Sequence, residues 1–416
     1  MSRAKEEFAP RTPPLVKIFT CGPSTYRRPH IGNYRTFLYE DLLVRYLEYL
    51  GFDVERVINF TDVEDKTITE ALDQGRTIRD ITGAVADRFF EETRLLGIKI
   101  PEDVPRATTS IDSAVQIVEK LMADGYAYRH DGDIFFAPLK KKDFGKLFRL
   151  DMSRWPKKTV RFRKDTYNGR RWNLGDFVLW HGKEDGILEK VEGNFKTTLG
   201  EGRPSWNIQD PAMILKHLGP TVDINCGGID NIYRHHDYNI AIMEAYSGET
   251  YANFYLHGEH LVVDGKSMSK SRGNILYPED VLVGDAEPRH LRHFLFSTHY
   301  RKKLNYTEKR FHNAVRFLNQ ARKTAAAVAG DLSDLKVASA HDAPPASAAE
   351  GTAGIQILSS FEEAMNNDLS AADALSAVSK ELDAIAGGNA PSKRERDGIR
   401  AALTRVDSVL GVFGGE

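Results

Sequence analysis

The chain has 416 residues, with 57 Lys and Arg against 59 Asp and Glu. This length predicts two or three domains, and the balanced charge excludes a protein drawn to nucleic acid or membrane by its overall field. Its two cysteines, Cys21 and Cys226, exclude a disulfide framework and are typical of a reducing compartment. The N-terminus is charged and no apolar run reaches about 18 residues, so we expect a cytoplasmic protein without a membrane span.

The first sixty residues alternate apolar runs with an amphipathic segment. LVKIFT (15–20) and DVERVINF (53–60) have the composition of buried strands. Between them, apolar residues from Phe37 to Leu50 recur at helical spacing, and Gly51 ends the predicted helix. A strand, a helix and a strand in close succession form a βαβ unit and imply a parallel sheet.

The pattern changes after residue 125. Residues 126–203 are polar and basic with short strand-like runs, which predicts an insert. VDINCGG (222–228) then resumes a buried strand, followed by a helix from about Arg234 to Ser247. We therefore expect an α/β domain in two halves, an insert between them and a helical domain at the end. The predicted ranges are 1–125 and 204–300 for the two halves, 126–203 for the insert and 301–416 for the helical domain.

HIGN, residues 30–33, lies where the first predicted strand passes into the helix. The N–H groups at a helix N-terminus favour phosphate by about 0.3–1 kcal/mol from the dipole alone. Gly32 would let a ligand approach the backbone, and the His30 imidazole can donate to a phosphate oxygen. A histidine at this position is also a common helix cap. The tetrapeptide alone therefore does not distinguish a phosphate site from a cap.

A second element, VDGKSMSKSRGN, occupies residues 263–274. Lys266, Lys270 and Arg272 stand there in a loop rich in serine and glycine. Mobile cations of this kind suit the stabilisation of a transferring polyphosphate. A solvated basic loop is the alternative interpretation.

Together the two elements resemble the class I aminoacyl-tRNA synthetases, and within that class the cysteinyl-tRNA synthetase family. The resemblance rests on blocks that follow the family's order: FTCGPSTYRRPHIGNYRTFLYEDLLVRYLEYLGFDV, VINFTDVEDK, GRPSWNIQDPAM, CGGIDNIYRHHDYNIA, HGEHLVVDGKSMSKSRGN and LRHFLFSTHYRKKLNYT. It implies a class I synthetase fold, in which a Rossmann-like domain with a parallel sheet is split by an insert and followed by a helical bundle. It also implies a two-step ligase that forms an aminoacyl-adenylate from ATP, with Mg²⁺, and then passes the aminoacyl group to an acceptor.

The resemblance also implies roles for individual positions. The catalytic residues would be His30, Asn33 and Lys270. The ATP-binding residues would be Gly22, His30, Gly32, Asn33, Gly227, Gly228, Lys266, Ser269 and Lys270. The amino-acid-binding residues would be Cys21, Thr61, Trp206, Asp210, Asp230, His235 and Asn239.

Some of these positions depart from the family pattern. Asn33 replaces the second histidine of the HIGH motif, and Ser267 replaces the first lysine of the KMSKS motif, with Lys266 one place earlier. Asp230 is kept and would pair with the ammonium group of the substrate.

The largest departure concerns zinc, which the family's cysteine enzymes hold with two Cys, one His and one Glu. Cys21 and His235 match two of these ligands, whereas Asp210 stands for the second Cys and Asn239 for the Glu. The metal candidates are thus Cys21, Asp210 and His235. Replacing a thiolate by a carboxylate oxygen and a carboxylate by a neutral amide both weaken the binding of zinc, a metal that prefers soft ligands here. We therefore expect a degenerate zinc site.

Without a metal–thiolate bond, a pocket distinguishes side chains that differ by one group by only about 1–3 kcal/mol. We therefore hypothesise that the activated amino acid is not cysteine. Gln209, Asp210 and Asn239 would suit a polar or amine-bearing side chain. The alternative is that these are neutral replacements in a chain that no longer activates an amino acid.

The acceptor stays open between tRNA, a small amine and a carrier protein. Family enzymes that charge tRNA carry a further small domain after the helical bundle, whereas this sequence ends with DSVLGVFGGE, which matches the end of the bundle. On this ground we expect a short, tRNA-independent or altered-acceptor paralogue, and a monomer. Basic and aromatic residues between Arg154 and Arg171 point the other way, because such a patch can hold a polyanion such as a tRNA acceptor end.

Three functions follow. The leading one is an AMP-forming ligase that is not cysteine-specific. The others are a working cysteine–tRNA ligase and a nucleotide-binding paralogue without turnover. The residues that the resemblance implies for adenylate formation are retained, which argues against a protein without turnover.

Overall fold

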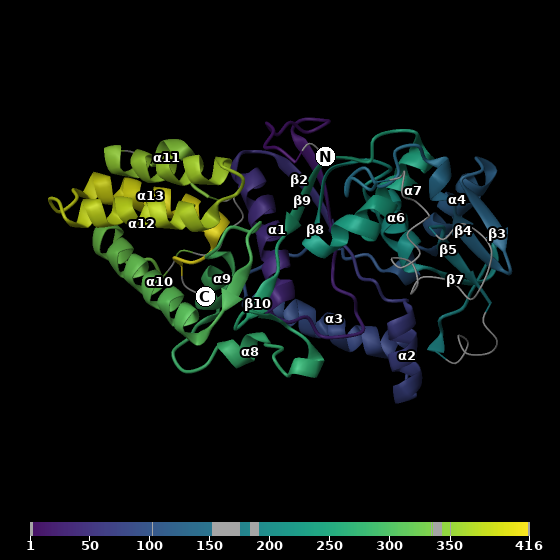
Figure 1. Ribbon diagram of the computed structural model, residues 1–416. Helices are drawn as coiled ribbons and strands as arrows, with labels where there is room; N and C mark the ends of the chain where they lie inside the picture. Colours follow the sequence, from purple (N-terminus) through teal and green to yellow (C-terminus); the bar gives the residue numbers. More distant parts are fainter. Residues whose placement is uncertain are drawn as a thin grey trace.

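The computed structural model describes residues 3–101, 103–151, 175–183, 191–333, 335, 343–349 and 351–414. At its centre is a parallel four-stranded sheet in the order β2-β1-β8-β9 (Figure 1). Its strands are β1 (Leu15–Thr20), β2 (Asp53–Ile58), β8 (Val222–Gly228) and β9 (Ala252–Gly258). The predicted parallel α/β sheet is therefore confirmed.

The helix between the first two strands, α1 (Ile31–Tyr49), is buried along nearly its whole length. Apolar residues such as Leu38 and Leu42 recur on it at a spacing of three to four residues. It is covered by the sheet on one side and by the C-terminal helices on the other (Figure 1), so it has no solvated face of its own. The turn that follows reverses at Gly51, whose φ of +90° suits glycine.

An antiparallel sheet of five strands, in the order β3-β4-β5-β7-β6, lies at the opposite end of the molecule from the C-terminal helices (Figure 1). Its strands are β3 (Ala127–His130), β4 (Asp133–Phe136), β5 (Phe177–Gly182), β6 (Phe195–Thr197) and β7 (Gly200–Pro204). The helices near it and the parallel sheet are α2 (Asp65–Gln74), α3 (Ile78–Leu95), α4 (Ile111–Ala123), α6 (Trp206–His217) and α7 (Asp237–Ser247). The predicted basic patch between Arg154 and Arg171 lies outside the described residues.

A small three-stranded sheet carries the second sequence motif. It consists of β10 (Leu261–Val263), β11 (Lys266–Ser267) and β12 (Leu304–Tyr306). The helices that follow are α8 (Pro278–Val281), α9 (Pro288–Phe296), α10 (Glu308–Ala329), α11 (Thr352–Asn366), α12 (Ala371–Ala386) and α13 (Lys393–Leu410). The last four pack together as a bundle. In the described part of the chain, no helix is both long and apolar enough to cross a membrane.

The start of α7 differs from the prediction. The helix begins at Asp237 rather than Arg234, because Tyr233 is extended and Arg234 has a φ of +73°. Consecutive residues of a regular helix point about 100° apart. The kink instead lets His235 and His236 both reach the cluster around Asp210 and Cys21.

A buried ionic network joins α1 to the C-terminal half. Arg292, on α9, donates to the Asp41 carboxylate of α1 at 2.8 Å and to the backbone carbonyls that end α3 and α13. Arg45 donates to the same carboxylate at 2.9 Å. Burial by itself raises the pKa of Asp41, but the two guanidinium groups outweigh it and the pKa lies below its usual value. The carboxylate is thus charged and fully paired.

We expect Arg292→Met to lower the free energy of unfolding by about 3–5 kcal/mol, because it leaves a buried carboxylate with one cation fewer and several carbonyls without donors. Urea denaturation followed by circular dichroism measures this. Arg396→Met, at an exposed position of α13, is the control and should change stability by no more than about 0.5 kcal/mol. A loss below about 1 kcal/mol in Arg292→Met would contradict this account.

Candidate active site

His30 caps α1. Its Nδ1 accepts hydrogen bonds from the backbone N–H groups of Gly32 and Asn33 at 3.2 and 3.3 Å, and the Asn33 side chain accepts from the His30 N–H at 3.0 Å. Burial lowers the pKa of His30, so the ring is neutral at pH 7. A neutral ring that accepts at Nδ1 carries its proton on Nε2. His30 is therefore a helix cap that also keeps an N–H donor for a ligand.

The two sequence motifs meet at Gly32. A Cβ on Gly32 would lie 2.7 Å from the Met268 side chain and 3.0 Å from the His30 ring. Met268 belongs to the MSKS segment, which follows the β10–β11 hairpin and its Asp264–Gly265 turn. The missing side chain of Gly32 thus admits this loop, a reason for the glycine that the sequence did not reveal.

The lysines of the loop are exposed. Lys266 lies in β11, and Lys270 begins a short 3-10 turn that Ser269 precedes. The Ser269 N–H donates to the Asn274 side chain at 3.0 Å, and Arg272 donates to the Ser267 carbonyl at 3.0 Å. These bonds shape the loop while both lysines stay available to an anion.

The carboxyl end of β8 supplies the glycines predicted for the ATP site. The Tyr39 hydroxyl holds the backbone of Gly227 by bonds to its N–H and its carbonyl, at 3.0 and 2.8 Å. A Cβ on Gly228 would lie 2.6 Å from the Asp230 carboxylate. Ligands of open α/β sheets bind beyond the carboxyl ends of the strands, and β1 and β8 end here side by side.

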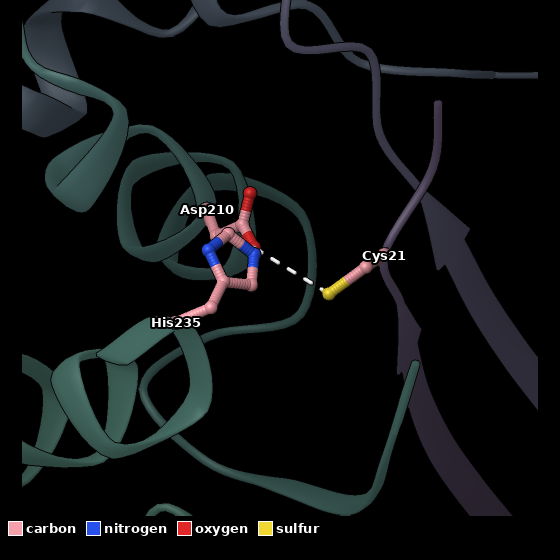
Figure 2. Close-up of side chains that lie close together, drawn as sticks. All are labelled: Cys21, Asp210 and His235. Atoms are coloured by element: carbon pink, nitrogen blue, oxygen red, sulfur yellow. Dashed lines mark hydrogen bonds and ion pairs between the residues drawn. The ribbon is translucent and has the colours of Figure 1, made fainter. Parts of the chain in front are cut away.

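Three predicted pocket residues converge from separate parts of the chain. Figure 2 shows the side chains of Cys21, Asp210 and His235 pointing toward one another, with one donor atom of each within 4.8 Å of the others. His235 Nε2 lies 2.7 Å from Asp210 Oδ2, and Cys21 Sγ lies 3.7 Å from the same oxygen. The sequence match therefore brought together residues that are adjacent in space.

Asp210 is the centre of this pocket. Its Oδ1 accepts from the Asn59 amide at 2.9 Å, and its Oδ2 accepts from the Asn239 amide at 3.3 Å. Burial by itself lowers the pKa of His235, but the Asp210 carboxylate outweighs it and the pKa lies above its ordinary value. The result is a buried carboxylate paired with an imidazole and two amides.

Cys21 also contacts a second pair of histidines, His236 directly and His257 through His236. Its Sγ lies 3.1 Å from His236 Nε2, and His236 Nδ1 lies 2.8 Å from His257 Nε2. Burial, followed by the Asp210 carboxylate, raises the pKa of the Cys21 thiol. Burial lowers the pKa of His236 and brings that of His257 to about 4. This chain of groups is uncharged at pH 7.

The donors do not match a soft zinc site. His235 Nε2 shares a hydrogen bond with Asp210 where a ligand would present a lone pair, and Asn239 directs its amide nitrogen, a donor, toward the same carboxylate. The family's set has two thiolates, one imidazole and one carboxylate, whereas the cluster that the described residues form has one sulfur, one imidazole and one carboxylate. Cys21, Asp210 and His235 could surround an ion, but the hydrogen bonds satisfy the carboxylate by themselves.

Contacts within the protein hold several other residues that the sequence named. Trp206 stacks on the His235 ring, with centroids 5.8 Å apart, and the Thr61 carbonyl accepts from the backbone and hydroxyl of Thr25. Gly22 follows β1, where a Cβ would lie 1.7 Å from the Asn59 carbonyl, so close packing of the backbone accounts for this glycine. Gln209 uses its amide nitrogen on the carbonyls of Val63 and Pro204, and this nitrogen is therefore not offered to a substrate.

Sequence reasoning missed several residues of the site. Asn59, Tyr39, His236 and His257 hold Asp210, Gly227 and Cys21 in place. The position of Asn59 directly after β2, at the carboxyl edge of the sheet, was the one available signal.

Comparison with solved structures identifies the class of fold. The chain superimposes on the methionyl-tRNA synthetase of Mycobacterium tuberculosis with a TM-score of 0.62 at 14% identity, over 95% of this chain and 90% of that one. It superimposes on LeuRS of Agrobacterium radiobacter K84 with a TM-score of 0.67 at 12% identity, over 98% and 85%. The fold is that of the class I aminoacyl-tRNA synthetases.

Comparison of sequences identifies the family. Residues 7–316 match the family model described as tRNA synthetases class I (C) catalytic domain. The chain is 34% identical to a cysteine–tRNA ligase of Oceanobacillus iheyensis, over 99% of its length and 86% of that protein. It is also 34% identical to a cysteine–tRNA ligase of Methanosarcina mazei, over 100% and 87%. The chain belongs to the cysteinyl-tRNA synthetase family, a family of ligases. These matches do not by themselves show a missing C-terminal domain.

We expect Gly32→Ala to lower ATP–pyrophosphate exchange by on the order of tenfold, because the added methyl meets both the end of the Met268 side chain and the His30 ring that caps α1. The double variant with Met268→Ala should recover part of the exchange, since it removes one of the two groups that the methyl meets. Thermal unfolding is the control, and the single variant should be no less stable than the parent, because alanine favours a helix more than glycine does. Unchanged exchange in Gly32→Ala would contradict the proposed loop contact.

Proposed function

We propose that this chain is an AMP-forming ligase that activates an amino acid other than cysteine and transfers it to an acceptor. The observation that carries the proposal is the buried Asp210, which stands where the family has a zinc thiolate and is held by Asn59, His235 and Asn239. The family and the fold support the adenylate chemistry. The altered pocket supports a substrate amino acid whose side chain is not that of cysteine.

In the first step, a carboxylate oxygen of the amino acid attacks the α-phosphorus of ATP and pyrophosphate leaves with the electron pair of the broken bond. The His30 Nε2–H and the exposed Lys270 would stabilise charge on the phosphates. The N-terminus of α1 adds its partial positive charge. Mg²⁺, when bound, would neutralise further charge on the phosphates. Asp230, beside Gly228, would pair with the ammonium group.

The floor of the pocket favours a polar or amine-bearing side chain. Two of the donors to Asp210 Oδ2 are long, at 3.3 Å from Asn239 and 3.7 Å from Cys21. An ammonium or hydroxyl group could replace these weak contacts and gain a charge-assisted bond. Cysteine would bring only a weak S–H donor and, without the metal, no thiolate bond.

A cysteine–tRNA ligase is the second candidate, and the names of the relatives favour it. In that case the cluster of Cys21, Asp210 and His235 would have to recognise a thiol. The acceptor of the leading candidate is tRNA, a small amine or a carrier protein.

Exchange of pyrophosphate into ATP, measured with each amino acid in turn and with or without total tRNA, tests the choice of substrate. We expect the highest exchange with an amino acid that carries a polar or amine side chain, and less than about one equivalent of zinc in the purified protein. Cysteine as the best substrate, together with about one equivalent of zinc, would refute the proposal and establish the second candidate. As a matched change, Asp210→Cys combined with Asn239→Glu should raise the zinc content toward one equivalent.

We expect Lys270→Ala to reduce the exchange rate by on the order of 100-fold, because a cation that stabilises the polyphosphate in the transition state is lost. Lys309→Ala, an exposed position on α10, is the control and should leave exchange unchanged. An exchange rate equal to the parent in Lys270→Ala would remove Lys270 from the transition state, and no exchange in the parent with any amino acid would favour a nucleotide-binding protein without turnover.

A further inference from the structure

Arg35 is a buried cation without a bound carboxylate. It lies on α1, shortly after the HIGN motif, and is only 4% exposed. Among the residues that the structure describes, no carboxylate lies within ion-pair distance of its guanidinium group, and Glu259 acts on it only through space. Buried charges in proteins are as a rule paired with an opposite charge. Arg35 therefore calls for a counter-ion that the protein chain itself does not supply.

Backbone carbonyls surround the two terminal nitrogens of this side chain. The Nη atoms donate to the carbonyls of Glu259, His260, Thr298, His299 and Lys302. These dipoles offset part of the positive charge, but a neutral group cannot cancel it. Burial lowers the pKa of Arg35 to about 10, so the guanidinium still carries its charge at pH 7.

The third nitrogen of Arg35 lacks an acceptor. Its Nε is buried and has no hydrogen-bond partner within the described part of the chain. A buried donor in this state is unusual in a folded protein and points to a bound water or ion. A cavity of about 20 Å³ lies beside Arg35. A cavity admits one water-sized occupant once it exceeds about 10–15 Å³, so this one has room for a single small ion and none for a polyatomic anion.

The walls of the cavity favour an ion over a water molecule. Leu38, Phe296 and Ala371 are among the apolar residues that line it. Of the polar residues in the wall, Tyr39 and Tyr300 already use their hydroxyls, and His299 uses both ring nitrogens. A buried water needs about three hydrogen bonds, and these walls offer it too few partners. A monovalent anion is held mainly by the charge of the guanidinium and tolerates apolar neighbours.

Tertiary contacts fix the far wall of the cavity. Leu369 lines it from the turn between α11 and α12 with a φ of +57°, a conformation uncommon for leucine. Its neighbour Asp368 accepts hydrogen bonds from Arg301 at 2.6 Å and from the Tyr300 hydroxyl at 2.8 Å. The cavity is therefore bounded by residues that the fold holds in place.

We propose that this cavity binds one halide ion, chloride under physiological conditions, as the counter-ion of Arg35. The ion accepts the hydrogen bond of the Nε–H and neutralises the buried guanidinium. It lies where α1 packs beside α9 (Figure 1) and where α12 begins. Arg35 also holds the carbonyls between β9 and β10, next to the hairpin that carries the MSKS loop. The ion thus stabilises the joint between α1, this hairpin and the helical bundle, whichever amino acid is activated.

Two measurements on the full chain test the site. Crystals soaked in sodium bromide, with diffraction recorded at the bromine absorption edge, should show an anomalous peak beside Arg35 Nε. Gluconate is too large for a cavity of about 20 Å³, so it serves as the reference anion. The melting temperature in sodium chloride should exceed that in sodium gluconate of equal concentration by about 2 °C or more, because an ion that binds only the folded state stabilises it.

The matched variants are Ala371→Val and Ala384→Val, both on α12. Ala371 lines the cavity, and the two added methyl groups fill it. Ala384 is exposed and serves as the control. Salts also act on the rest of the protein surface, and they do so alike in parent and variants, so the difference between the proteins isolates the cavity. We expect Ala371→Val to lose the bromide peak and the dependence on chloride, and Ala384→Val to keep both.

Each result supports or overturns the halide site. The bromide measurement on the parent needs no variant, and a cavity without an anomalous peak there would overturn the proposal. A peak combined with the same difference between the two salts in the parent and in Ala371→Val would show an adventitious ion only, and would overturn it as well. A peak together with a chloride effect that Ala371→Val abolishes and Ala384→Val retains would establish the site.

Discussion

The buried ion pair between Arg292 and Asp41 determines how the two halves of this chain meet. Asp41 lies in the middle of α1, and Arg292 binds it together with the carbonyls at the ends of α3 and α13. A buried carboxylate is tolerated only when it is paired and hydrogen-bonded, so the four helices have little freedom to separate. The N-terminus of α1, where His30 caps the helix, is thereby fixed with respect to the bundle.

Helix α1 also contacts the end of strand β8, where the glycines proposed for the ATP site lie. The Tyr39 hydroxyl, on the same helix, holds Gly227 at the end of β8, and its ring stacks on Tyr300 with centroids 4.9 Å apart. Arg301 next to it binds Asp368 in the turn between α11 and α12. A continuous set of contacts therefore runs from the glycines proposed for the ATP site to the bundle.

The pocket proposed for the amino acid differs from a zinc site in how its polar groups are held together. A metal site brings together donors that would otherwise repel each other or compete for water. In this chain, Asp210 is hydrogen-bonded by an imidazole and two amides, all from within the protein. Such a pocket selects a ligand by the hydrogen bonds it offers to a carboxylate, whereas a zinc site selects by softness.

The sequence by itself determined the order of strands and helices in the first domain, the parallel sheet and the membership of the family, and it named two motifs as candidates for a nucleotide site. It did so because apolar periodicity and motif residues are local, and the motif blocks keep their order along the chain. It also named Cys21, Asp210 and His235 as neighbours, through matched positions. Only the tertiary structure decided what these residues do together. The kink at Arg234 that turns both histidines inward, the bond from Asn59 to Asp210 and the contact of Gly32 with Met268 each depend on segments far apart in sequence, whose approach is fixed by packing.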